Sequence, residues 1–423
     1  MVNIPKGTKD VLPSQSEKWH YIEKNIREVA DLFDMSEIRT PTFEHTELFL
    51  RSIGDETDVV SKEMYTFEDK GGRSITLKPE GTAAVARSYI ENALDAMSLP
   101  LKLYYVTPVF RYEAPQAGRL REHHQFGAEF YGSESPYMDA EAINVAFTLL
   151  SKVGVKDLEL NINSIGCPEC CKKYNAALKE YLGGCVDKMC DNCKRRFLTN
   201  PLRILDCKEE GCKAIVKDAP VILDYVCDDC RAHFDELQRI LTDEGIPFKV
   251  NKSIVRGLDY YTKTVFEFVT TSLGAQGTVC GGGRYDNLVE SIGGKHTPCV
   301  GFGMGIERLI MLLDAYEKEF PKRRLNFYIA NQSPSNRDLC GKIVSSLRRN
   351  GYSAEADFMD RSVKAQLKFA NKRNAEYVAV IGESEAESGA VTLKRMADGA
   401  TANVSLADLM NGAQNAAFVS KEI

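Results

Sequence analysis

Apolar residues near the start of the chain follow the period of an α-helix. Across residues 14–33 they recur at steps of three and four, at Trp19, Ile22, Ile26, Val29 and Phe33. Ser14 and Glu17 have the spacing of a capping box just after Pro13, which predicts the start of the helix. We interpret the stripe as a core-packing face and assign it no chemistry.

Strand-like patterns dominate the middle of the chain. Two β-rich runs, 101–113 and 125–131, flank a loop that holds Pro115 and Gly118. This arrangement predicts an antiparallel hairpin with a long tip. A strand that runs directly into a helix is predicted over residues 301–310. Further strands are predicted at 157–163, at Val255 and at 264–269.

The pattern changes again after residue 324. Strands are predicted at 326–330, 352–357 and 376–382, and helices at 335–350 and 363–373. Strands that alternate with helices indicate an α/β unit with a mainly parallel sheet.

Length and charge narrow the class of protein. The chain has 423 residues, of which 43% are apolar and 27% charged, as is typical of soluble globular proteins. At roughly 100–200 residues per domain, two to four domains are expected. The net charge of −6 means that any contact with nucleic acid must come from local basic patches. The first residues lack the apolar region of a secretory signal, and no run approaches the ~18 apolar residues of a membrane span, so we expect a cytoplasmic protein.

The cysteines are concentrated in one stretch. Ten of the 13 lie between Cys167 and Cys230, in a charged and mostly helical region that we interpret as an insertion. Without an export signal, thiols or thiolate–metal sites are favoured over disulfides. The spacing predicts two zinc-binding quartets: Cys167, Cys170, Cys190 and Cys193, and then Cys207, Cys212, Cys227 and Cys230. The alternative is an insertion that folds without binding a metal.

Glycine runs and arginines suggest a phosphate site of an unusual kind. Neither 281–283 nor the glycines at 301, 303 and 305 form a Walker A or G-x-G-x-x-G motif. Arginines nevertheless stand beside both runs and around the hairpin loop, at Arg111, Arg119, Arg121, Arg284 and Arg308. The planar donor fork of arginine matches phosphate, although structural ion pairing would explain any single one of them.

Three separated segments resemble motifs 1, 2 and 3 of the class II aminoacyl-tRNA synthetases. They are Ile38-Arg39-Thr40-Pro41, Phe110-Arg111-Tyr112-Glu113 and Gly301-x-Gly303-x-Gly305-x-Glu307-Arg308. Two further runs resemble the signature of the histidyl-tRNA synthetase family: Val255-Arg256-Gly257-Leu258-Asp259-Tyr260-Tyr261 and Gly281-Gly282-Gly283-Arg284-Tyr285-Asp286. The resemblance covers essentially the whole chain.

This resemblance implies a fold in three parts. Residues 1–324 would form a class II α+β catalytic domain, in which an antiparallel sheet flanked by helices binds ATP. A small, mostly helical, cysteine-rich insertion at 167–245 would interrupt it. Residues 325–423 would form an anticodon-binding α/β domain with a mixed, mainly parallel sheet. The family also implies a homodimer through motif 1.

The implied activity is ATP-dependent ligation of L-histidine to histidine tRNA through a histidyl adenylate, with release of AMP and pyrophosphate. The alternative is a non-catalytic regulatory subunit of ATP phosphoribosyltransferase. That class lacks the anticodon domain and tends to lose the arginines found here at 111, 256 and 308. A sensor module of a larger kinase would need further domains that 423 residues cannot hold.

By the same resemblance, Arg111 and Arg256 are the catalytic residues and contact the α-phosphate. Arg119 and Arg308 would hold the outer phosphates together with Mg²⁺. Glu113 would receive the adenine edge or orient Arg111, and we expect Phe126 to stack on adenine.

The remaining implied roles concern histidine and tRNA. Glu80, Thr82 and Gln125 match residues that bind the ammonium group, and Glu129 and Tyr261 match those that read the imidazole. Gln125 and Glu129 are four apart, so on a strand they share one face. The histidine-binding set is completed by Tyr260, Arg111 and Arg256. Gln116 and Arg121 resemble the residues that meet the acceptor end of the tRNA, whereas His123 and His124 are expected to have ordinary polar roles.

Overall fold

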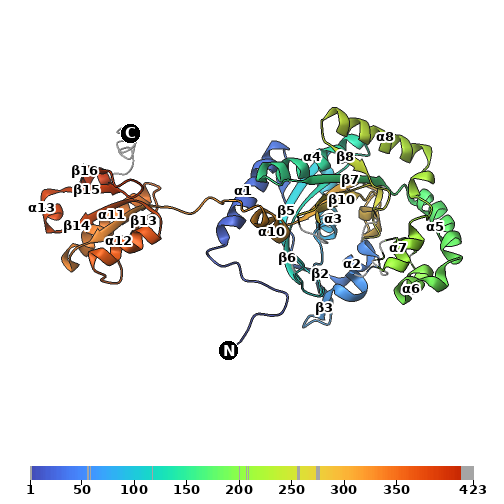
Figure 1. The fold of residues 1–423 in the computed structure, drawn as a ribbon, viewed down its shortest axis with the longest axis horizontal. Helices are drawn as coiled ribbons and strands as arrows, with labels where there is room; N and C mark the ends of the chain where they lie inside the picture. The colour runs from blue at the N-terminus through green and yellow to red at the C-terminus, as the bar shows by residue number, and fades with distance from the viewer. Residues whose placement is uncertain are drawn as a thin grey trace. The chain divides into compact units, whose positions relative to one another are not determined.

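The computed structural model describes residues 2–54, 57, 59–116, 118–199, 201–205, 207, 209–254, 258–272 and 277–410. The chain forms two compact units, Met1–Phe320 and Pro321–Ile423 (Figure 1). Val255 and Arg256, which the sequence analysis singled out, lie outside the described residues.

An eight-stranded sheet is the centre of the first unit. Its order is β1 (Ser36–Glu37), β5 (Leu101–Phe110), β6 (Glu122–Tyr131), β11 (Cys299–Gly305), β10 (Thr278–Arg284), β9 (Thr262–Thr270), β7 (Leu158–Ser164) and β8 (Phe248–Val250). The inner pairings are all antiparallel, and only the two edge pairings, β1 with β5 and β7 with β8, are parallel. The predicted antiparallel platform is confirmed, including the hairpin of β5 and β6.

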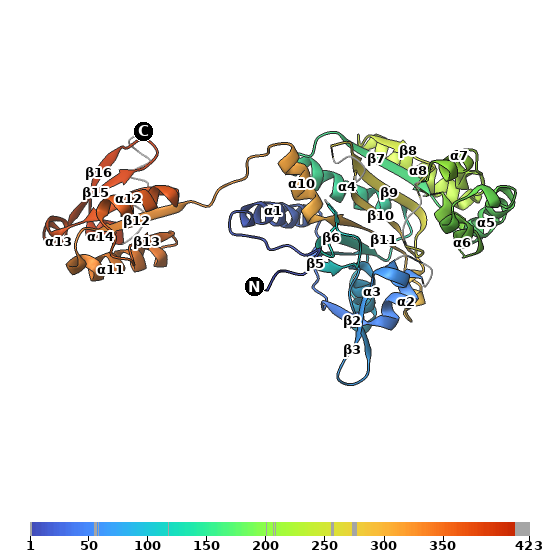
Figure 2. The same cartoon turned by 60° about the horizontal axis from the view of Figure 1, so that its bottom comes forward.

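Helices lie on both sides of this sheet. The main core gathers apolar side chains from α1 (Ser16–Leu32), α4 (Pro136–Val153), α8 (Asp228–Asp243) and α10 (Ile306–Ala315) against the central strands. Figure 2 shows α1, α4 and α10 on one side of the sheet and α2 (Thr46–Ile53) and α3 (Thr82–Glu91) on the other.

The predicted helix near the start is confirmed as α1, which buries Ile22, Ile26 and Val29. Its predicted capping box is wrong, because the helix begins after Gln15, which makes no side-chain cap. A turn at residues 12–15, closed by the Gln15 N–H on the Leu12 carbonyl oxygen (2.8 Å), delays the first helical residue.

A small antiparallel sheet stands beside α2 and α3. It consists of β2 (Phe43–His45), β4 (Ser74–Leu77) and β3 (Tyr65–Glu68), in that order. The end of β4 leads directly through Glu80 into α3, so this sheet determines where the first turn of α3 lies.

The cysteine-rich stretch forms a helical lobe between β7 and β8. It contains α5 (Pro168–Gly183), α6 (Asp191–Thr199) and α7 (Glu210–Val216), joined by short 3-10 turns. The lobe has its own core around Tyr174, Leu178, Leu182, Ile204 and Ile222. The helix that follows, α8, packs into the main core instead, through Phe234, Leu237, Ile240 and Leu241.

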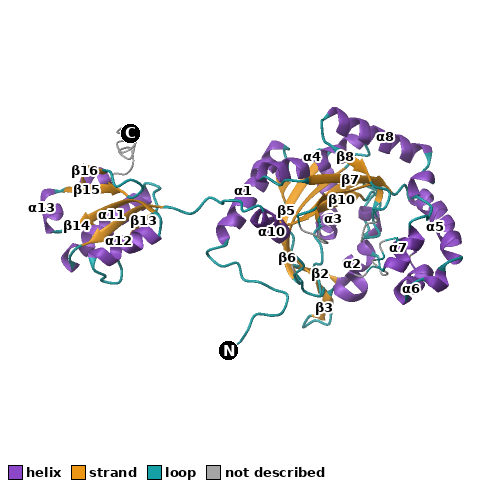
Figure 3. Ribbon diagram, viewed as in Figure 1, coloured by secondary structure: helices purple, strands orange, loops and turns teal. Residues whose placement is uncertain are grey.

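The second unit is a five-stranded mixed sheet with helices on both faces (Figure 3). Parallel pairings join β13 (Ala354–Ala356), β12 (Leu325–Asn331) and β14 (Ala375–Ile381); antiparallel pairings add β15 (Ala390–Arg395) and β16 (Thr401–Ser405). One core lies under α11 (Arg337–Arg349) and the other under α12 (Val363–Lys372). The strand–helix alternation was predicted, and the hairpin of β15 and β16 was not. Over the described part of the chain, no helix combines the length and the apolar character needed to cross a membrane.

Candidate active site

A cavity of about 390 Å³ opens on the sheet of the first unit, over strands β9, β10 and β11. Most of the residues that the sequence marked for ATP and histidine line it: Glu80, Thr82, Arg111, Glu113, Arg119, Gln125, Tyr260, Tyr261 and Arg308. They come from segments far apart in the sequence, and the hairpin, α3 and the start of α10 bring them together.

One end of the cavity is strongly cationic. Arg111 stands just after β5, and its Nε donates to the Pro79 carbonyl oxygen (2.8 Å). Arg308, in the first turn of α10, donates to the carbonyl oxygens of Thr278 (2.6 Å) and Gly118 (3.2 Å). Arg119 pairs with Glu113 at 3.3 Å. These bonds hold three guanidinium groups over one space.

The electrostatics of this end favour an anion. Burial lowers the pKa of Arg308, and the positive charges of Arg119 and Arg111 lower it further. His123 lines the same space, and burial together with Arg111 and Arg308 lowers its pKa to about 3. His123 is therefore neutral at physiological pH, and a polyanion such as a triphosphate would relieve the repulsion among the arginines.

The other end of the cavity is rich in acceptors. Glu80 is buried and accepts the backbone N–H groups of Thr82 (2.7 Å) and Ala83 (2.8 Å), which cap the first turn of α3. Burial raises the pKa of this carboxyl. Gln125 accepts the N–H of Gly81 (3.2 Å), so both side chains are anchored to the turn that leads into α3.

Glu129 lies directly behind this end and is fully buried. Its carboxyl accepts from the hydroxyls of Thr82 (2.7 Å), Tyr105 (3.0 Å) and Tyr285. Burial raises the pKa of Glu129 to about 8, against the lowering effect of the hydroxyls of Tyr285 and Thr82. Thr82 thus connects the cavity wall to a buried carboxyl whose pKa is raised toward neutral pH.

The glycines of β11 make room for these side chains. A Cβ at Gly301 would lie 2.0 Å from Glu129 Oε2, and a Cβ at Gly303 would lie 2.0 Å from Gln125 Nε2. Gly301 and Gly303 of motif 3 are therefore required, because the side chains of Glu129 and Gln125, on the adjacent strand β6, occupy the space where their Cβ atoms would lie. Glu307, in the same motif, accepts from the backbone N–H of His124 (2.8 Å) and joins α10 to the start of β6.

Phe126, which was expected to stack on adenine, and Arg284, which was grouped with the phosphate-matching arginines, do not line the cavity. Phe126 is buried in the main core, edge-on to Tyr104 and Phe302, because it faces the side of β6 opposite to Gln125. Its proposed stacking on adenine is not supported by this position. Arg284 is also fully buried and forms an ion pair with Asp139 through its Nε (2.9 Å) and with Asp286 (3.1 Å), so it holds the sheet to α4 and does not face the cavity.

The hairpin loop carries the two residues expected to meet tRNA. Gln116 is exposed, and its backbone pairs with that of Arg119. The Arg121 guanidinium stacks on the Tyr112 ring at 3.7 Å, and its Nε donates to the Glu113 carbonyl oxygen (3.3 Å). Neither residue lines the cavity. Sequence reasoning assigned no site role to Tyr105, Tyr285 or Glu267, because motif spacing does not reveal which side chains reach Glu129 or the cavity.

The cysteines form two quartets, but with a different pairing from the one predicted. Cys167, Cys170, Cys227 and Cys230 form an outer quartet, and Cys190, Cys193, Cys207 and Cys212 form an inner one. In each quartet the four sulfur atoms lie within 4.8 Å of one another. The predicted grouping by order along the chain is wrong because the lobe folds back on itself. The first and last cysteine pairs of the stretch therefore meet in one quartet, and the two middle pairs form the other.

An antiparallel sheet on which motifs 2 and 3 bring Arg111 and Arg308 to one cavity defines a class II aminoacyl-tRNA synthetase. Comparison with known proteins identifies the family within this class. Residues 7–309 match the histidyl-tRNA synthetase family and residues 326–415 match an anticodon-binding domain. The chain belongs to the histidyl-tRNA synthetase family.

Individual relatives agree over the full length. The chain is 53% identical over 416 residues to the histidine–tRNA ligase of Caldanaerobacter subterraneus, covering 98% of this chain and 100% of the relative. It is 56% identical over 409 residues to that of Clostridium novyi, covering 96% and 97%. Among solved structures, apo histidyl-tRNA synthetase of S. aureus superposes with a TM-score of 0.83 at 38% identity, covering 97% of this chain and 99% of that one.

Proposed function

We propose that this protein ligates L-histidine to histidine tRNA in two steps. In the first step, a carboxylate oxygen of histidine forms a bond to the α-phosphorus of ATP, and pyrophosphate leaves. In the second step, a ribose hydroxyl at the tRNA 3′ end attacks the carbonyl carbon of the histidyl adenylate, and AMP leaves. The observation that carries the proposal is a single cavity that joins a cluster of arginines to an acceptor-rich end.

The arginine end suits phosphoryl transfer, which depends on positioning and on neutralising spread negative charge. Arg111 is proposed to contact the α-phosphate, and Arg119 and Arg308 the outer phosphates. Arg256 is proposed as the second contact at the α-phosphate on the strength of its sequence motif alone. Glu113, two residues after Arg111, is proposed to receive the adenine edge or to orient Arg111.

Class II synthetases use Mg²⁺ with ATP, and the donor set of the cavity fits such an ion. The carboxylate of Glu267 lines the wall, and Mg²⁺ prefers one or two carboxylates together with substrate phosphates. When bound, the ion would neutralise charge on the phosphates.

The acceptor end suits the amino acid. Glu80, Thr82 and Gln125 are proposed to bind the ammonium group. Glu129 is proposed to accept an N–H of the imidazole, while Tyr261 engages the other nitrogen and Tyr260 packs beside it, with ring centroids 4.8 Å apart. A site of this kind rejects side chains of similar size that lack the ring N–H, because its buried polar groups would be left unpaired.

Further partners follow from the family. Gln116 and Arg121 on the hairpin loop are proposed to meet the acceptor end of the tRNA, and the second unit is proposed to bind the anticodon. A homodimer through motif 1 is proposed as the functional assembly. None of the 13 cysteines forms a disulfide in the structure, which agrees with the cytoplasmic location that we propose. For the two cysteine quartets, Zn²⁺ is the metal that four thiolates favour.

A regulatory subunit that binds histidine without charging tRNA is the competing function. The chain keeps Arg111 and Arg308 in the cavity, and it keeps an anticodon-binding domain. Its full-length relatives are histidine–tRNA ligases. These features favour the ligase.

Pyrophosphate exchange measured with each of the common amino acids, with and without histidine tRNA, tests the proposal. We expect strong exchange with histidine only, and transfer of histidine to the tRNA. Histidine binding without exchange would favour the regulatory subunit instead.

A further inference from the structure

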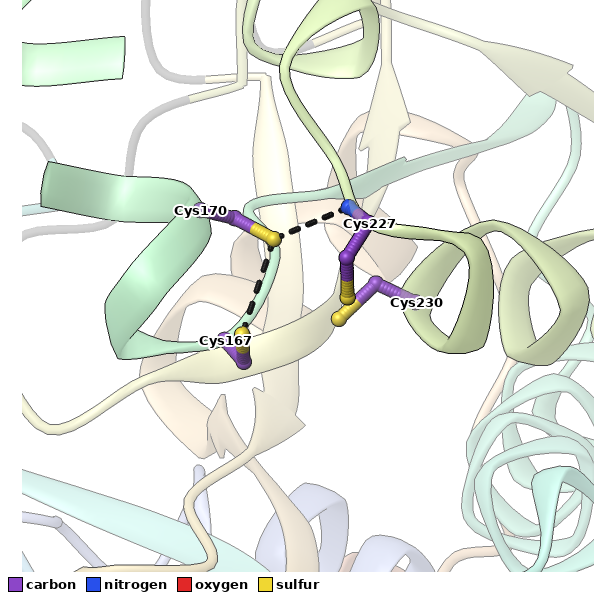
Figure 4. Close-up of side chains that lie close together, drawn as sticks. All are labelled: Cys167, Cys170, Cys227 and Cys230. Carbon is purple, nitrogen blue, oxygen red and sulfur yellow. Dashed lines mark hydrogen bonds between the residues drawn. The ribbon is translucent and has the colours of Figure 1, made fainter. Parts of the chain in front are cut away.

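The outer quartet joins the two places where the chain crosses between the sheet and the helical lobe. Cys167 directly precedes α5 and Cys170 lies in the first turn of that helix. Cys227 directly precedes α8 and Cys230 lies in its first turn. Figure 4 shows the two pairs facing each other from the starts of these two helices. The partial positive charge of both helix ends favours thiolates there.

The sulfur geometry fits one tetrahedral ion per quartet. Zn–S bonds of about 2.3 Å place tetrahedral sulfurs about 3.8 Å apart. The Sγ atoms of Cys167 and Cys170 are 3.5 Å apart, and those of Cys190 and Cys207 in the inner quartet are 3.9 Å apart. A four-iron cluster would spread its thiolates further, because each would bind a different iron atom.

Backbone groups support the thiolates of both quartets. The N–H of Cys227 donates to Cys170 Sγ (3.1 Å), and the N–H of Cys190 donates to Cys212 Sγ (3.3 Å). Such bonds orient sulfur ligands and stabilise their negative charge. Cys171 and Cys185, the two other cysteines of this stretch, belong to neither quartet.

The outer quartet is also linked by backbone hydrogen bonds to the segment that carries Tyr260 and Tyr261 into the active site. Gly166, next to Cys167, accepts the backbone N–H of Lys263 (2.7 Å), and the Ile165 N–H donates to the Lys263 carbonyl oxygen (2.8 Å). Lys263 is two residues after Tyr261. A Cβ at Gly166 would lie 2.4 Å from Cys170 Cβ, so this crossing packs tightly against the quartet.

A second cavity lies along the same route. Its volume is about 390 Å³, and Cys171 and Tyr174 of α5 line it together with Leu258 and Tyr261, which also line the active site. Leu258 and Tyr261 therefore separate the active site from the second cavity. The opposite wall of that cavity is α5, the helix that begins at the outer quartet.

We propose that each quartet binds one Zn²⁺ and that the two ions have different roles. The inner ion holds the fold of the helical lobe. The outer ion clamps the two crossings together and, through the pairing of residues 165 and 166 with Lys263, positions the segment of Tyr260 and Tyr261 against histidine. The second role rests on the proposed function; the binding of two ions does not.

Metal analysis of the full-length protein, purified without added zinc, tests the first part. We expect two zinc ions per chain, and one in each of the double variants Cys227→Ser/Cys230→Ser (outer) and Cys207→Ser/Cys212→Ser (inner). The matched control, Cys171→Ser/Cys185→Ser, should keep two. Protein without metal, iron in place of zinc, or an outer variant that still holds two ions would overturn the proposal.

Histidine-dependent pyrophosphate exchange tests the second part. The outer double variant should raise KM for histidine severalfold, leave KM for ATP near wild type, and speed hydrogen exchange at the backbone amide of Lys263. The inner variant should speed exchange within the lobe and leave KM for histidine nearly unchanged. Equal effects of both variants on KM for histidine, or no effect of the outer one, would exclude the clamp.

A single variant separates loss of the metal from loss of the fold. Cys227 is the more exposed of the pair at α8, and Cys227→His supplies a nitrogen ligand that zinc also accepts. Cys227→His should keep two zinc ions and a near-normal KM for histidine. If it keeps both ions but its KM for histidine rises as much as in the outer double variant, the metal is not what positions the segment, and the clamp is contradicted. A protein that holds two zinc ions but shows no exchange with histidine would refute the ligase function and leave the metal sites in place.

Discussion

The carboxyl group of Glu129 is fully buried and accepts hydrogen bonds from three hydroxyl groups, those of Thr82, Tyr105 and Tyr285. Burial raises its pKa from the ordinary 4.5 to about 8. A group in this state can respond to a ligand that brings an N–H, because a new donor favours the charged form. Substitution of Glu129 should therefore affect both histidine recognition and the pH dependence of stability.

The first of these effects concerns histidine recognition. Glu129→Ala should raise KM for histidine and lower turnover, with KM for ATP little changed. The loss in kcat/KM should be about 2–4 kcal/mol, as for truncating one partner of a buried charge-assisted contact. Glu129→Gln should be milder but still impaired, since a neutral amide replaces a charged acceptor. Exchange kinetics with histidine and ATP varied separately are the measurement; a shift confined to KM for ATP would place Glu129 in the nucleotide pocket.

The second effect concerns pH. Because the pKa of Glu129 is higher in the folded protein than in the unfolded chain, the folded state binds more protons between pH 4.5 and about 8. Its contribution to stability is therefore full below pH 4.5 and is lost as pH rises through 8, with a slope of up to about 1.4 kcal/mol per pH unit. Urea unfolding of wild type and Glu129→Gln from pH 5 to 9 should show a wild-type decline that the variant lacks. Parallel curves for the two proteins would contradict the raised pKa.

Among single residues, the sequence predicted most of the cavity wall. It failed for residues whose role depends on which side of the sheet the side chain faces. Gln125 and Glu129 were placed on one face of a strand by their even spacing, and the structure agrees for both. The same rule puts Phe126 on the opposite face, and it lies in the core. Arg284 was grouped with the phosphate-facing arginines because the sequence does not show that Asp139, 145 residues away, pairs with it.

Elements are predictable where the local pattern decides them. The long helix α1, the β5–β6 hairpin and the strand-to-helix step at Gly305 all follow from periodicity or turn residues. The pairing of the cysteine quartets depends on how a whole lobe folds back, and chain order alone suggested the wrong partners. The strands of the small sheet β2–β4–β3 have only three or four residues each, which is too short for a clear period of their own.

One prediction belongs to strand β11. A Cβ at Gly301 would collide with Glu129 Oε2 and with the Ala128 carbonyl oxygen, at 2.0 Å and 2.5 Å. Gly301→Ala should destabilise the protein by about 1–3 kcal/mol, the usual cost of overpacking, and should raise KM for histidine by displacing Glu129. Urea unfolding and pyrophosphate exchange measure the two effects.

Gly341 provides the matched control for this substitution. It lies inside α11, and a Cβ there would meet nothing within 4 Å. Gly341→Ala should therefore leave adenylation unchanged and stabilise the protein by up to about 1 kcal/mol, as expected for alanine in a helix interior. Equal behaviour of the two variants would show that the glycine of motif 3 is not there to accommodate Glu129.

At the scale of the whole molecule, the change from strand-rich to alternating patterns near residue 324 predicted two architectures in one chain. Each unit of the structure has its own core: that of Met1–Phe320 gathers around the eight-stranded sheet, and those of Pro321–Ile423 lie on both faces of the five-stranded sheet. The net charge of −6 gave no sign of a partner nucleic acid, because the proposed contacts are local. Only the motifs identified tRNA as the substrate.

Because the two units have separate hydrophobic cores, adenylate formation and tRNA charging should be separable by truncation. A chain that ends at Arg324 keeps the cavity, the helical lobe and the whole of the main core, so it should fold and form histidyl adenylate at a rate within a few-fold of the full-length protein. It should charge histidine tRNA at least about tenfold less efficiently, because each 1.4 kcal/mol of lost anticodon contact costs a factor of ten in affinity. Pyrophosphate exchange and charging, measured on the same preparation, are the test, with circular dichroism and sedimentation to verify fold and assembly. Full charging efficiency in a folded truncated protein would remove the anticodon role from the second unit, whereas loss of both activities in a folded one would mean that the second unit takes part in adenylation.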